Sequence, residues 1–241
     1  DRRAAALTGE TVRAVLEAVP GMPEAPSSVA AGDLDGDENP DLAAGGAWGP
    51  QAVVSVVLGD GKGGFREPSR VPAGAGAVSL LCGDLDRDGD LDLIVVDAFQ
   101  GRVSVLRNEG KGTFRQGVKF EFGPTPIGIG LADLAGDGRL DLVATTEGQG
   151  NVASVVSILL GDGEGNFPEV VRYEPGGFCF GGKIADIDGD GRLDIAVGNG
   201  DTNDVSVMFH VADLLGLPGR KSATAKEAGA PAEPPAKEGA R

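Results

Sequence analysis

A nine-residue acidic pattern, Asp-x-Asp-x-Asp-Gly-x-x-Asp, recurs four times with small departures and constrains the fold more than any other feature. The copies occupy residues 33–41, 84–92, 133–141 and 186–194, so their first residues lie 51 (33 to 84), 49 (84 to 133) and 53 (133 to 186) positions apart. Carboxylates packed this densely repel one another unless a cation lies among them. A period of about 50 residues in strand-like sequence is typical of propeller blades or solenoids.

Short apolar runs flank every copy. One run precedes the acidic residues, a second follows directly, and a third comes shortly after, as in Val103-Ser104-Val105-Leu106. In the first three repeats a Gly-rich hairpin then leads through Phe65, Phe114 or Phe167 into a more polar run. β-Branched runs bounded by Gly and Asp predict short buried strands. Four strands per repeat describe one propeller blade.

Composition agrees with this fold and excludes several classes of partner. The 241 residues include 41 Gly and only 5% aromatics, which suits many short strands joined by tight turns. The formal net charge of −16 argues against nucleic acid and against an anionic membrane surface as partners. No stretch approaches the roughly 20 apolar residues of a membrane span.

We therefore expect an all-β fold, a β-propeller of about four four-stranded blades that forms a small closed ring or an arc of a larger propeller. The propeller is predicted over residues 11–218, with blades at 27–73, 77–123, 127–174 and 178–210. The last blade lacks a fourth strand, which residues 11–19 are expected to supply. An amphipathic helix is the alternative there, because Val12, Val15, Leu16 and Val19 follow helical spacing. Residues 219–241, rich in Ala, Pro, Lys and Glu, predict a disordered tail.

These repeats resemble the FG-GAP/VCBS family, which includes the propeller of the integrin α-subunit. The resemblance rests on four in-phase acidic loops, each followed by a Val-Ser-Val-like run, over roughly residues 11–210. It implies that each loop joins the first and second strands of a blade and binds Ca²⁺. Carboxylates at loop positions 1, 3, 5 and 9 and the backbone carbonyl of position 7 are the implied ligands. It also implies an extracellular, cell-surface or periplasmic location.

Three complete ligand sets and one damaged set follow from the resemblance. The first set is Asp33, Asp35, Asp37, the carbonyl of Asn39, and Asp41. The second set is Asp84, Asp86, Asp88, the carbonyl of Asp90, and Asp92. The fourth set is Asp186, Asp188, Asp190, the carbonyl of Arg192, and Asp194. The third set keeps Asp133, Asp137, the carbonyl of Arg139, and Asp141. Because Ala135 replaces its position 3 carboxylate, we expect the third site to be weak or empty.

The acidic residues admit two other interpretations. An EF-hand requires a bidentate Glu at position 12, and this chain has Ala44, Val95, Ala144 or Val197 there. Plain Asp/Gly turns that only solubilise one face would not need carboxylates at three fixed alternate positions. In the Gly-rich hairpins, turn geometry explains Asp60, Glu109 and Asp162 better than a second ion site does.

The expected function is a non-enzymatic binding or adhesion module for a protein or carbohydrate ligand, with Ca²⁺ stabilising the blade loops. The ligand is expected at the irregular loops 45–51, 98–102, 147–151 and 198–204, where Trp48 and Phe99 are candidate contacts or ordinary packing residues. The alternative is a propeller domain of a polysaccharide-active enzyme, or an accessory domain of a larger secreted protein. No catalytic residue is expected, since the sole histidine, His210, ends a strand. Four blades also leave open self-association or a missing half-propeller.

Overall fold

The computed structural model describes residues 26–46, 52–74, 77–97, 100–121, 126–148, 154–175 and 178–216. The predicted closing strand at 11–19 and the predicted tail at 219–241 lie outside these residues. So do Trp48 and Phe99. Within the described residues, no helix is long and apolar enough to cross a membrane.

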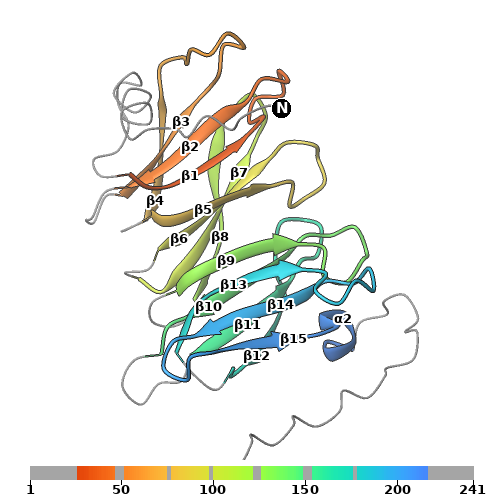
Figure 1. The fold of residues 1–241 in the computed structure, drawn as a ribbon. Helices are drawn as coiled ribbons and strands as arrows, with labels where there is room; N and C mark the ends of the chain where they lie inside the picture. The colour runs from red at the N-terminus through yellow and green to blue at the C-terminus, as the bar shows by residue number, and fades with distance from the viewer. Residues whose placement is uncertain are drawn as a thin grey trace, which may run out of the picture.

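Four antiparallel sheets, here called sheets 1 to 4 in chain order, make up nearly all of the regular structure (Figure 1). Sheet 1 contains β1 (Pro26–Gly32), β2 (Asp41–Gly46), β3 (Ala52–Val57) and β4 (Ser69–Gly74). Sheet 2 contains β5 (Ala77–Gly83), β6 (Asp92–Asp97), β7 (Arg102–Asn108) and β8 (Phe114–Glu121). Sheet 3 contains β9 (Pro126–Ala132), β10 (Asp141–Thr146), β11 (Val155–Leu160) and β12 (Glu169–Tyr173). Sheet 4 contains β13 (Cys179–Ala185), β14 (Asp194–Asn199) and β15 (Asp204–Met208).

Each sheet is a simple meander in which consecutive strands pair. The second strands β6 and β10 are buried along their whole length, because they lie inside a sheet that is covered on both faces. The fourth strands β8 and β12 are mostly exposed or half-buried, as their polar sequences predict. The predicted all-β class with repeated four-stranded blades is confirmed.

The sheets pack face to face through three apolar cores. Val54 and Val56 of sheet 1 pack with Leu80 and Val95 of sheet 2. The same third-strand positions of sheet 2 pack on sheet 3, and those of sheet 3 pack on sheet 4. We call the side of a sheet that packs on the following sheet its front face, and the opposite side its back face.

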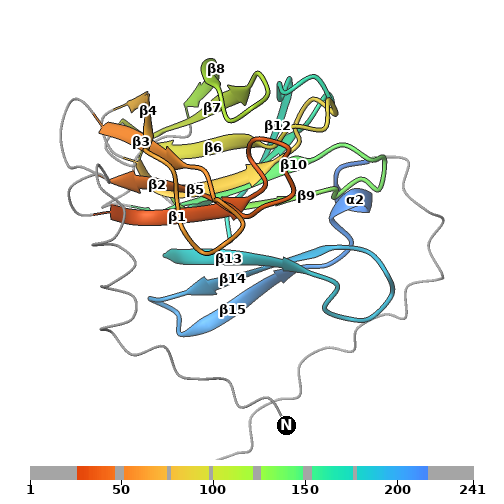
Figure 2. The same ribbon diagram turned by 90° about the horizontal axis from the view of Figure 1, so that it is seen from above.

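The described strands form an open arc. The first strands contact one another in chain order, β1 with β5, β5 with β9 and β9 with β13. Sheets 1 and 4 are the two ends of this series, and the described parts of the chain do not close it into a ring (Figures 1 and 2). Of the two predicted arrangements, the described residues agree with the arc.

A short helix, α2 (Val211–Leu214), follows β15 and was not predicted. Its first two residues, Val211 and Ala212, are buried, and Val211 joins the core formed with Ile195 and Val197. Four residues are too few for a periodic apolar pattern, so the sequence carries no helical signal here.

Candidate metal-binding loops

The four acidic loops, here called loops 1 to 4, connect the first and second strands of their sheets. They lie between β1 and β2, β5 and β6, β9 and β10, and β13 and β14. Because each loop connects the same two strands of its sheet, the four loops lie along one rim of the arc. The structure therefore has the connection that the family resemblance implies.

Position 9 of every loop is a fully buried aspartate that begins the second strand. These residues are Asp41, Asp92, Asp141 and Asp194. In each of them Oδ2 accepts the backbone N–H of loop position 2, at 2.7, 3.3, 3.0 and 2.9 Å in loops 1 to 4. Oδ1 accepts a backbone N–H at the end of the third strand, at 2.7, 2.8, 2.9 and 2.8 Å. Position 9 thus ties the loop to two strands, a role that was not predicted from the sequence.

Positions 1 and 5 shape the backbone of the loop. In loop 1, Asp33 accepts the N–H groups of Gly36, Asp37 and Glu38 at 2.8 to 3.1 Å. The position 5 carboxylate accepts the N–H of position 7 in every loop, at 2.9, 2.9, 3.0 and 2.9 Å. The carbonyls of Asn39, Asp90, Arg139 and Arg192 belong to these position 7 residues, and their role as ligands stays a prediction.

Positions 4 and 6 adopt left-handed backbone conformations. Glycine occupies most of these positions, since it takes positive φ without steric cost. The two exceptions are Glu38 at position 6 of loop 1, with φ 65°, and Arg87 at position 4 of loop 2, with φ 62°. Glu38 stands where the acidic pattern has Gly, and its backbone conformation is the one that Gly favours.

The structure brings carboxylates together in three of the four loops. Within each trio the nearest oxygens lie within 4.8 Å of one another. The trios are Asp33, Asp35 and Asp37 in loop 1, Asp84, Asp86 and Asp88 in loop 2, and Asp186, Asp188 and Asp194 in loop 4. Loop 3, which is described throughout, supplies no trio of this kind. Its position 3 is Ala135, so one carboxylate is missing where the other loops have one.

Loop 2 contains buried carboxylate oxygens that no group of the chain satisfies. Asp84 Oδ1 and Asp86 Oδ1 are both buried and have no hydrogen-bond partner. Burial, together with the neighbouring charge of Asp88, raises the pKa of Asp86. Burial also raises the pKa of Asp92 to about 6, and the charges of Asp86 and Asp88 add to this shift. Buried carboxylate oxygens without partners are costly unless a cation or a donor satisfies them.

Arginines contact the carboxylates of all four loops. Arg66, from the β3–β4 connection, donates to Asp35 and Asp37 at 3.1 Å each. In the other loops Arg107 pairs with Asp86, Arg139 with Asp137, and Arg192 with Asp190. These contacts were not predicted from the sequence. Arg66 and Arg107 come from outside the acidic pattern, and only the folded sheet brings them to it.

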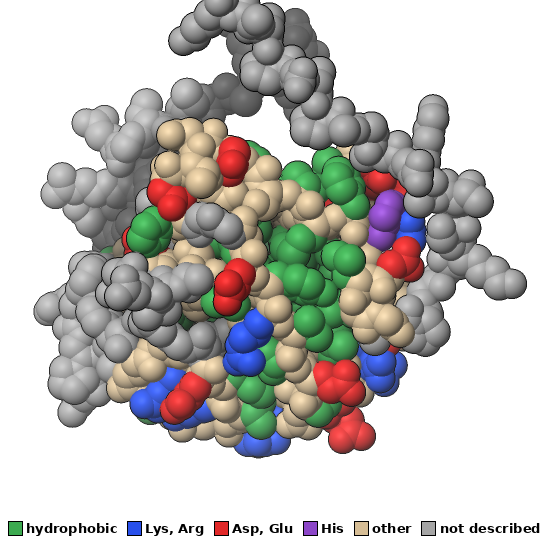
Figure 3. Space-filling view, turned by 90° about the horizontal axis from the view of Figure 1, so that it is seen from below, with side chains coloured by type: hydrophobic (Ala, Val, Ile, Leu, Met, Phe, Trp, Pro, Cys, Tyr) green, Lys and Arg blue, Asp and Glu red, His purple; other side chains and the backbone are tan. Residues whose placement is uncertain are grey.

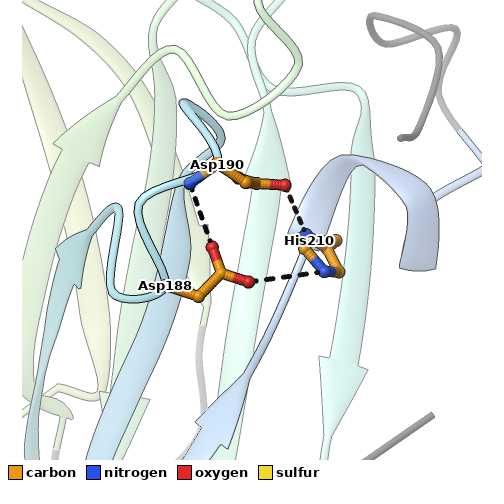
Figure 4. Close-up of side chains that lie close together, drawn as sticks. All are labelled: Asp188, Asp190 and His210. Carbon is orange, nitrogen blue, oxygen red and sulfur yellow. Dashed lines mark hydrogen bonds and ion pairs between the residues drawn. The ribbon is translucent and has the colours of Figure 1, made fainter. Parts of the chain in front are cut away.

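His210 contacts loop 4, as Figure 4 shows. Its Nδ1 lies 3.2 Å from Asp190 Oδ2 and its Nε2 lies 3.7 Å from Asp188 Oδ2. The backbone N–H of His210 donates to Asp194, as the backbone N–H of Gly59 does to Asp41 in sheet 1. The sequence placed His210 at the end of a strand but missed its contact with loop 4. Aligning it with Gly59 across the repeats would have indicated this position.

Two of the three acids of the Gly-rich hairpins, Asp60 and Asp162, stabilise turns, as expected. Asp60 Oδ1 accepts the N–H groups of Lys62 and Gly64, both at 2.8 Å, and these bonds lower the pKa of Asp60. Asp162 bonds in the same way within its own hairpin. Glu109 forms an exposed ion pair with Arg115. None of the three lies in the carboxylate trios described above.

Of the four irregular loops, the structure describes the one at 198–204 completely. Asp204 accepts from the Asn199 amide at 2.7 Å and from the Thr202 hydroxyl at 2.8 Å. Asp201 accepts the N–H of Phe178 at 2.8 Å, which ties the loop to the start of sheet 4. This loop is therefore held in shape by its own polar side chains.

Comparisons with known proteins agree with the repeat pattern. A family model described as an FG-GAP-like repeat matches three overlapping stretches, residues 33–95, 84–144 and 133–197. No curated protein matches the chain significantly. Among solved structures, the chain is similar to the Tc holotoxin pore of Photorhabdus luminescens, with 22% identity and a TM-score of 0.46. It is also similar to the V. cholerae biofilm matrix protein Bap1, with 17% identity and a TM-score of 0.39.

These two likenesses cover about three quarters of this chain but much less of the other proteins. The aligned regions span 75% of this chain and 9% of the toxin chain. For the matrix protein the shares are 76% and 37%. The chain therefore spans well under half the length of either protein.

Proposed function

The chain belongs to the FG-GAP-like repeat family, and on that premise we propose that it is a non-enzymatic binding module whose acidic loops hold Ca²⁺. Loops 1, 2 and 4 are the proposed sites, with the ligand sets given above. Loop 3 is proposed to bind weakly or not at all, because Ala135 offers no side-chain oxygen. Ca²⁺ takes six to eight hard oxygen ligands, which carboxylates and backbone carbonyls supply.

The proposal rests mainly on the unpaired carboxylate oxygens of loop 2. Two buried carboxylate oxygens, on Asp84 and Asp86, have no partner within the chain. The nearby Arg107 reaches only the other oxygen of Asp86, at 3.3 Å. A divalent cation among these oxygens would satisfy both and would offset the burial and the charge repulsion that raise the pKa of Asp86. The donor set of loop 2 therefore fits Ca²⁺.

The ion is proposed to act as a staple rather than as a reactant. Position 9 already fixes both ends of each loop through buried hydrogen bonds, and the ion would hold positions 1, 3 and 5 between them. Binding to the folded form alone stabilises that form by mass action. Weak extracellular-type sites have dissociation constants on the order of 10⁻⁴ to 10⁻³ M. Such sites fill where Ca²⁺ is abundant, so we propose that the protein works outside the cytoplasm.

Ligand recognition is proposed to lie in the irregular loops between second and third strands. Loops carried on a rigid sheet scaffold commonly bear binding sites. A protein or a carbohydrate is the proposed ligand class. The hydrogen-bonded loop at 198–204 supports this proposal, because a loop held in shape loses little conformational freedom on binding.

The test is thermal unfolding of the full chain in EDTA and in millimolar Ca²⁺. We expect a higher melting temperature in Ca²⁺ and a smaller gain in the double variant Asp84→Asn, Asp86→Asn. The control is Glu169→Gln, which removes a negative charge at an exposed position on β12 and should keep the full gain. Equal melting temperatures in EDTA and in Ca²⁺ for the wild-type chain would refute the staple.

A further inference from the structure

Loop 4 differs from the other acidic loops in the side chain that the end of its third strand brings to it. In each sheet, one residue there donates its backbone N–H to the position 9 aspartate: Gly59, Asn108, Gly161 and His210 in sheets 1 to 4. Two of these residues have no side chain, and the amide of Asn108 donates to backbone carbonyls. His210 is the only histidine of the chain, so loop 4 alone has an imidazole beside its carboxylates.

The backbone of His210 is fixed on both sides. Its N–H donates to Asp194 at 2.8 Å, and its carbonyl accepts the N–H groups of Asp213 and Leu214 at 2.9 and 3.2 Å. These bonds hold His210 in a left-handed conformation, with φ 54°, directly before α2. Such a conformation is uncommon for a residue other than Gly and persists only where its surroundings hold it. The imidazole is therefore presented to loop 4 by a fixed backbone.

The imidazole lies against two carboxylates of loop 4 (Figure 4). One nitrogen of His210 and one oxygen each of Asp188 and Asp190 lie within 4.8 Å of one another. The distance from Nδ1 to Asp190 Oδ2 is 3.2 Å. Two ligands of one zinc ion, with bonds of about 2.1 Å at a tetrahedral angle, lie roughly 3.4 Å apart. His210 and Asp190 are thus spaced as two ligands of one ion, and Asp188 completes a set of three.

The Nδ1 atom of His210 is buried and has no hydrogen-bond partner among the described residues. Asp190 is near enough for an ion pair, but the contact lacks the geometry of a hydrogen bond. Buried polar atoms are normally satisfied by a partner, and a neutral imidazole nitrogen without a proton is a metal ligand. The rest of the ring is accessible, since Figure 3 shows the histidine at the surface beside acidic and basic side chains. An ion can therefore reach this site from solvent.

The carboxylates of loop 4 are also grouped differently. In loops 1 and 2 the trio of carboxylates comes from positions 1, 3 and 5 of the loop. In loop 4 the trio is Asp186, Asp188 and Asp194, and the position 5 residue Asp190 groups with Asp188 and His210 instead. Position 5 of loop 4 thus belongs to a second cluster, which shares Asp188 with the first.

Arg192 orients the carboxylate of Asp190 in this second cluster. Its Nε donates to Oδ2 at 2.7 Å and its backbone N–H donates to Oδ1 at 2.9 Å. Arg192 is held in turn by Asp213, at 2.5 Å. An ionised carboxylate has about four lone-pair sites, so each oxygen of Asp190 keeps one for an ion. Hydrogen bonds to a ligating carboxylate are the usual support of a metal site.

We propose that Asp188, Asp190 and His210 bind a divalent transition-metal ion of the zinc class in preference to Ca²⁺. Imidazole nitrogen suits Zn²⁺, Cu²⁺ and Ni²⁺, whereas Ca²⁺ takes oxygen ligands. The proposal rests on the proposed function in one respect, that loop 4 holds a cation, and it holds whether or not loops 1 and 2 bind Ca²⁺. Because Asp188 is shared, Zn²⁺ and Ca²⁺ compete at loop 4.

The test is NMR of the ¹⁵N-labelled full chain without an affinity tag, at constant pH. The sole histidine gives one pair of ring-nitrogen signals, which need no assignment among several residues. We expect Zn²⁺ to shift the signal of one ring nitrogen, since that nitrogen becomes a ligand. An excess of Ca²⁺ should shift neither signal by a comparable amount. Ring-nitrogen signals that stay in place in saturating Zn²⁺ would overturn the proposal.

Calorimetric titration with Zn²⁺ identifies the other ligands. His210→Ala and Asp190→Asn should each weaken the tightest Zn²⁺ site by at least about tenfold, with circular dichroism unchanged. The matched control is Asp137→Asn, the same change at position 5 of loop 3, where no histidine lies near, and it should leave that affinity unaltered. An Asp190→Asn variant that binds Zn²⁺ as tightly as the wild type would place the ion elsewhere and overturn the assignment.

The outcomes separate this proposal from the proposed function. A chain that melts at the same temperature in EDTA and in Ca²⁺, but whose histidine responds to Zn²⁺, would refute the Ca²⁺ staple and support the zinc-class site. A chain that Ca²⁺ stabilises, but whose histidine does not respond to Zn²⁺, would support the staple and overturn the zinc-class site.

Discussion

Asp92 Oδ1 accepts the backbone N–H of Asn108 at 2.8 Å, and so ties the end of acidic loop 2 to the end of the third strand of its sheet. The same bond recurs in all four sheets, and in each the second oxygen of the aspartate accepts an N–H from the loop. Position 9 therefore has a structural role that is independent of any ion.

Loop 3 isolates that role, because it has no carboxylate trio. We predict that Asp141→Ala lowers the free energy of unfolding in EDTA and in Ca²⁺ alike. The change leaves the buried N–H groups of Leu134 and Gly161 without acceptors, at a cost of about 1–3 kcal/mol each. Urea unfolding, carried out once in EDTA and once in Ca²⁺, measures the loss. Asp141→Asn keeps one acceptor oxygen and should lower the free energy of unfolding by less than Asp141→Ala. Equal losses in the two variants would contradict the account.

The pH dependence of the metal-free protein should reflect Asp92. Its pKa is raised to about 6 in the folded protein from an ordinary value of 3.8, so the folded state holds the proton more tightly. A raised carboxyl pKa stabilises the fold at low pH, and this contribution is lost as the pH rises from about 4 through 6. We predict that, in EDTA, the contribution of Asp92 to the stability of the fold decreases between pH 5 and pH 7.

Carbon-detected NMR titration of the Asp92 carboxyl group in EDTA gives the pKa directly, and thermal melts at pH 5 and pH 7 give its effect on stability. The control is Glu121→Gln, at an exposed position on β8, which should leave the pH profile unchanged. A titration midpoint near 4 for Asp92 would remove the basis of this prediction.

Glu38 should be replaceable by Gly with a gain in stability. Its φ of 65° costs a non-glycine residue about 1–2 kcal/mol, and the extra freedom of Gly in the unfolded chain offsets about 0.5–1 kcal/mol of this. We predict a net gain of about 0.5–1 kcal/mol for Glu38→Gly. The reverse change, Gly36→Ala at φ 78°, should be destabilising, and chemical denaturation of both variants tests the pair. A loss of stability in Glu38→Gly would show that the Glu38 side chain contributes something else.

Arg66 should weaken the binding of Ca²⁺ to loop 1, because it donates to oxygens of Asp35 and Asp37. Its side chain is half exposed, and pairs of this kind are worth about 0–1 kcal/mol. We therefore predict that Arg66→Ala tightens the binding of Ca²⁺ to loop 1 by up to about fivefold. Calorimetric titration measures the change, with Arg115→Ala as a control that breaks an ion pair away from the loop. Weaker binding in Arg66→Ala would mean that Arg66 orients the carboxylates rather than competing for them.

The local architecture was predictable from the sequence because it repeats. Alternating apolar runs bounded by Gly and Asp gave the strands, and the acidic pattern gave the loops between first and second strands. Contacts between distant residues were not predictable, such as that of Arg66 with Asp35 or that of His210 with Asp188. They depend on how the third strand and its connection sit beside the loop, and no short-range pattern encodes that.

The position 9 aspartates show a second limit of the sequence. The pattern places Asp41 or Asp92 among the ion ligands, but it does not show that the residue is buried and bonded to two backbone N–H groups. The open arc shows a third limit. The sequence counts four repeats, but only the folded chain shows that Val205 of the last described sheet is exposed where its counterpart Val54 is buried.

The central claim is that loops 1, 2 and 4 bind Ca²⁺ and that loop 3 does not, and the number of ions per chain tests it most directly. We predict three ions in isothermal titration calorimetry of the wild-type chain, two in the variant Asp84→Asn, Asp86→Asn, and four in Ala135→Asp. The last variant restores the position 3 carboxylate of loop 3. A wild-type chain that binds no Ca²⁺, or an Ala135→Asp variant that binds no more than the wild type, would contradict the account.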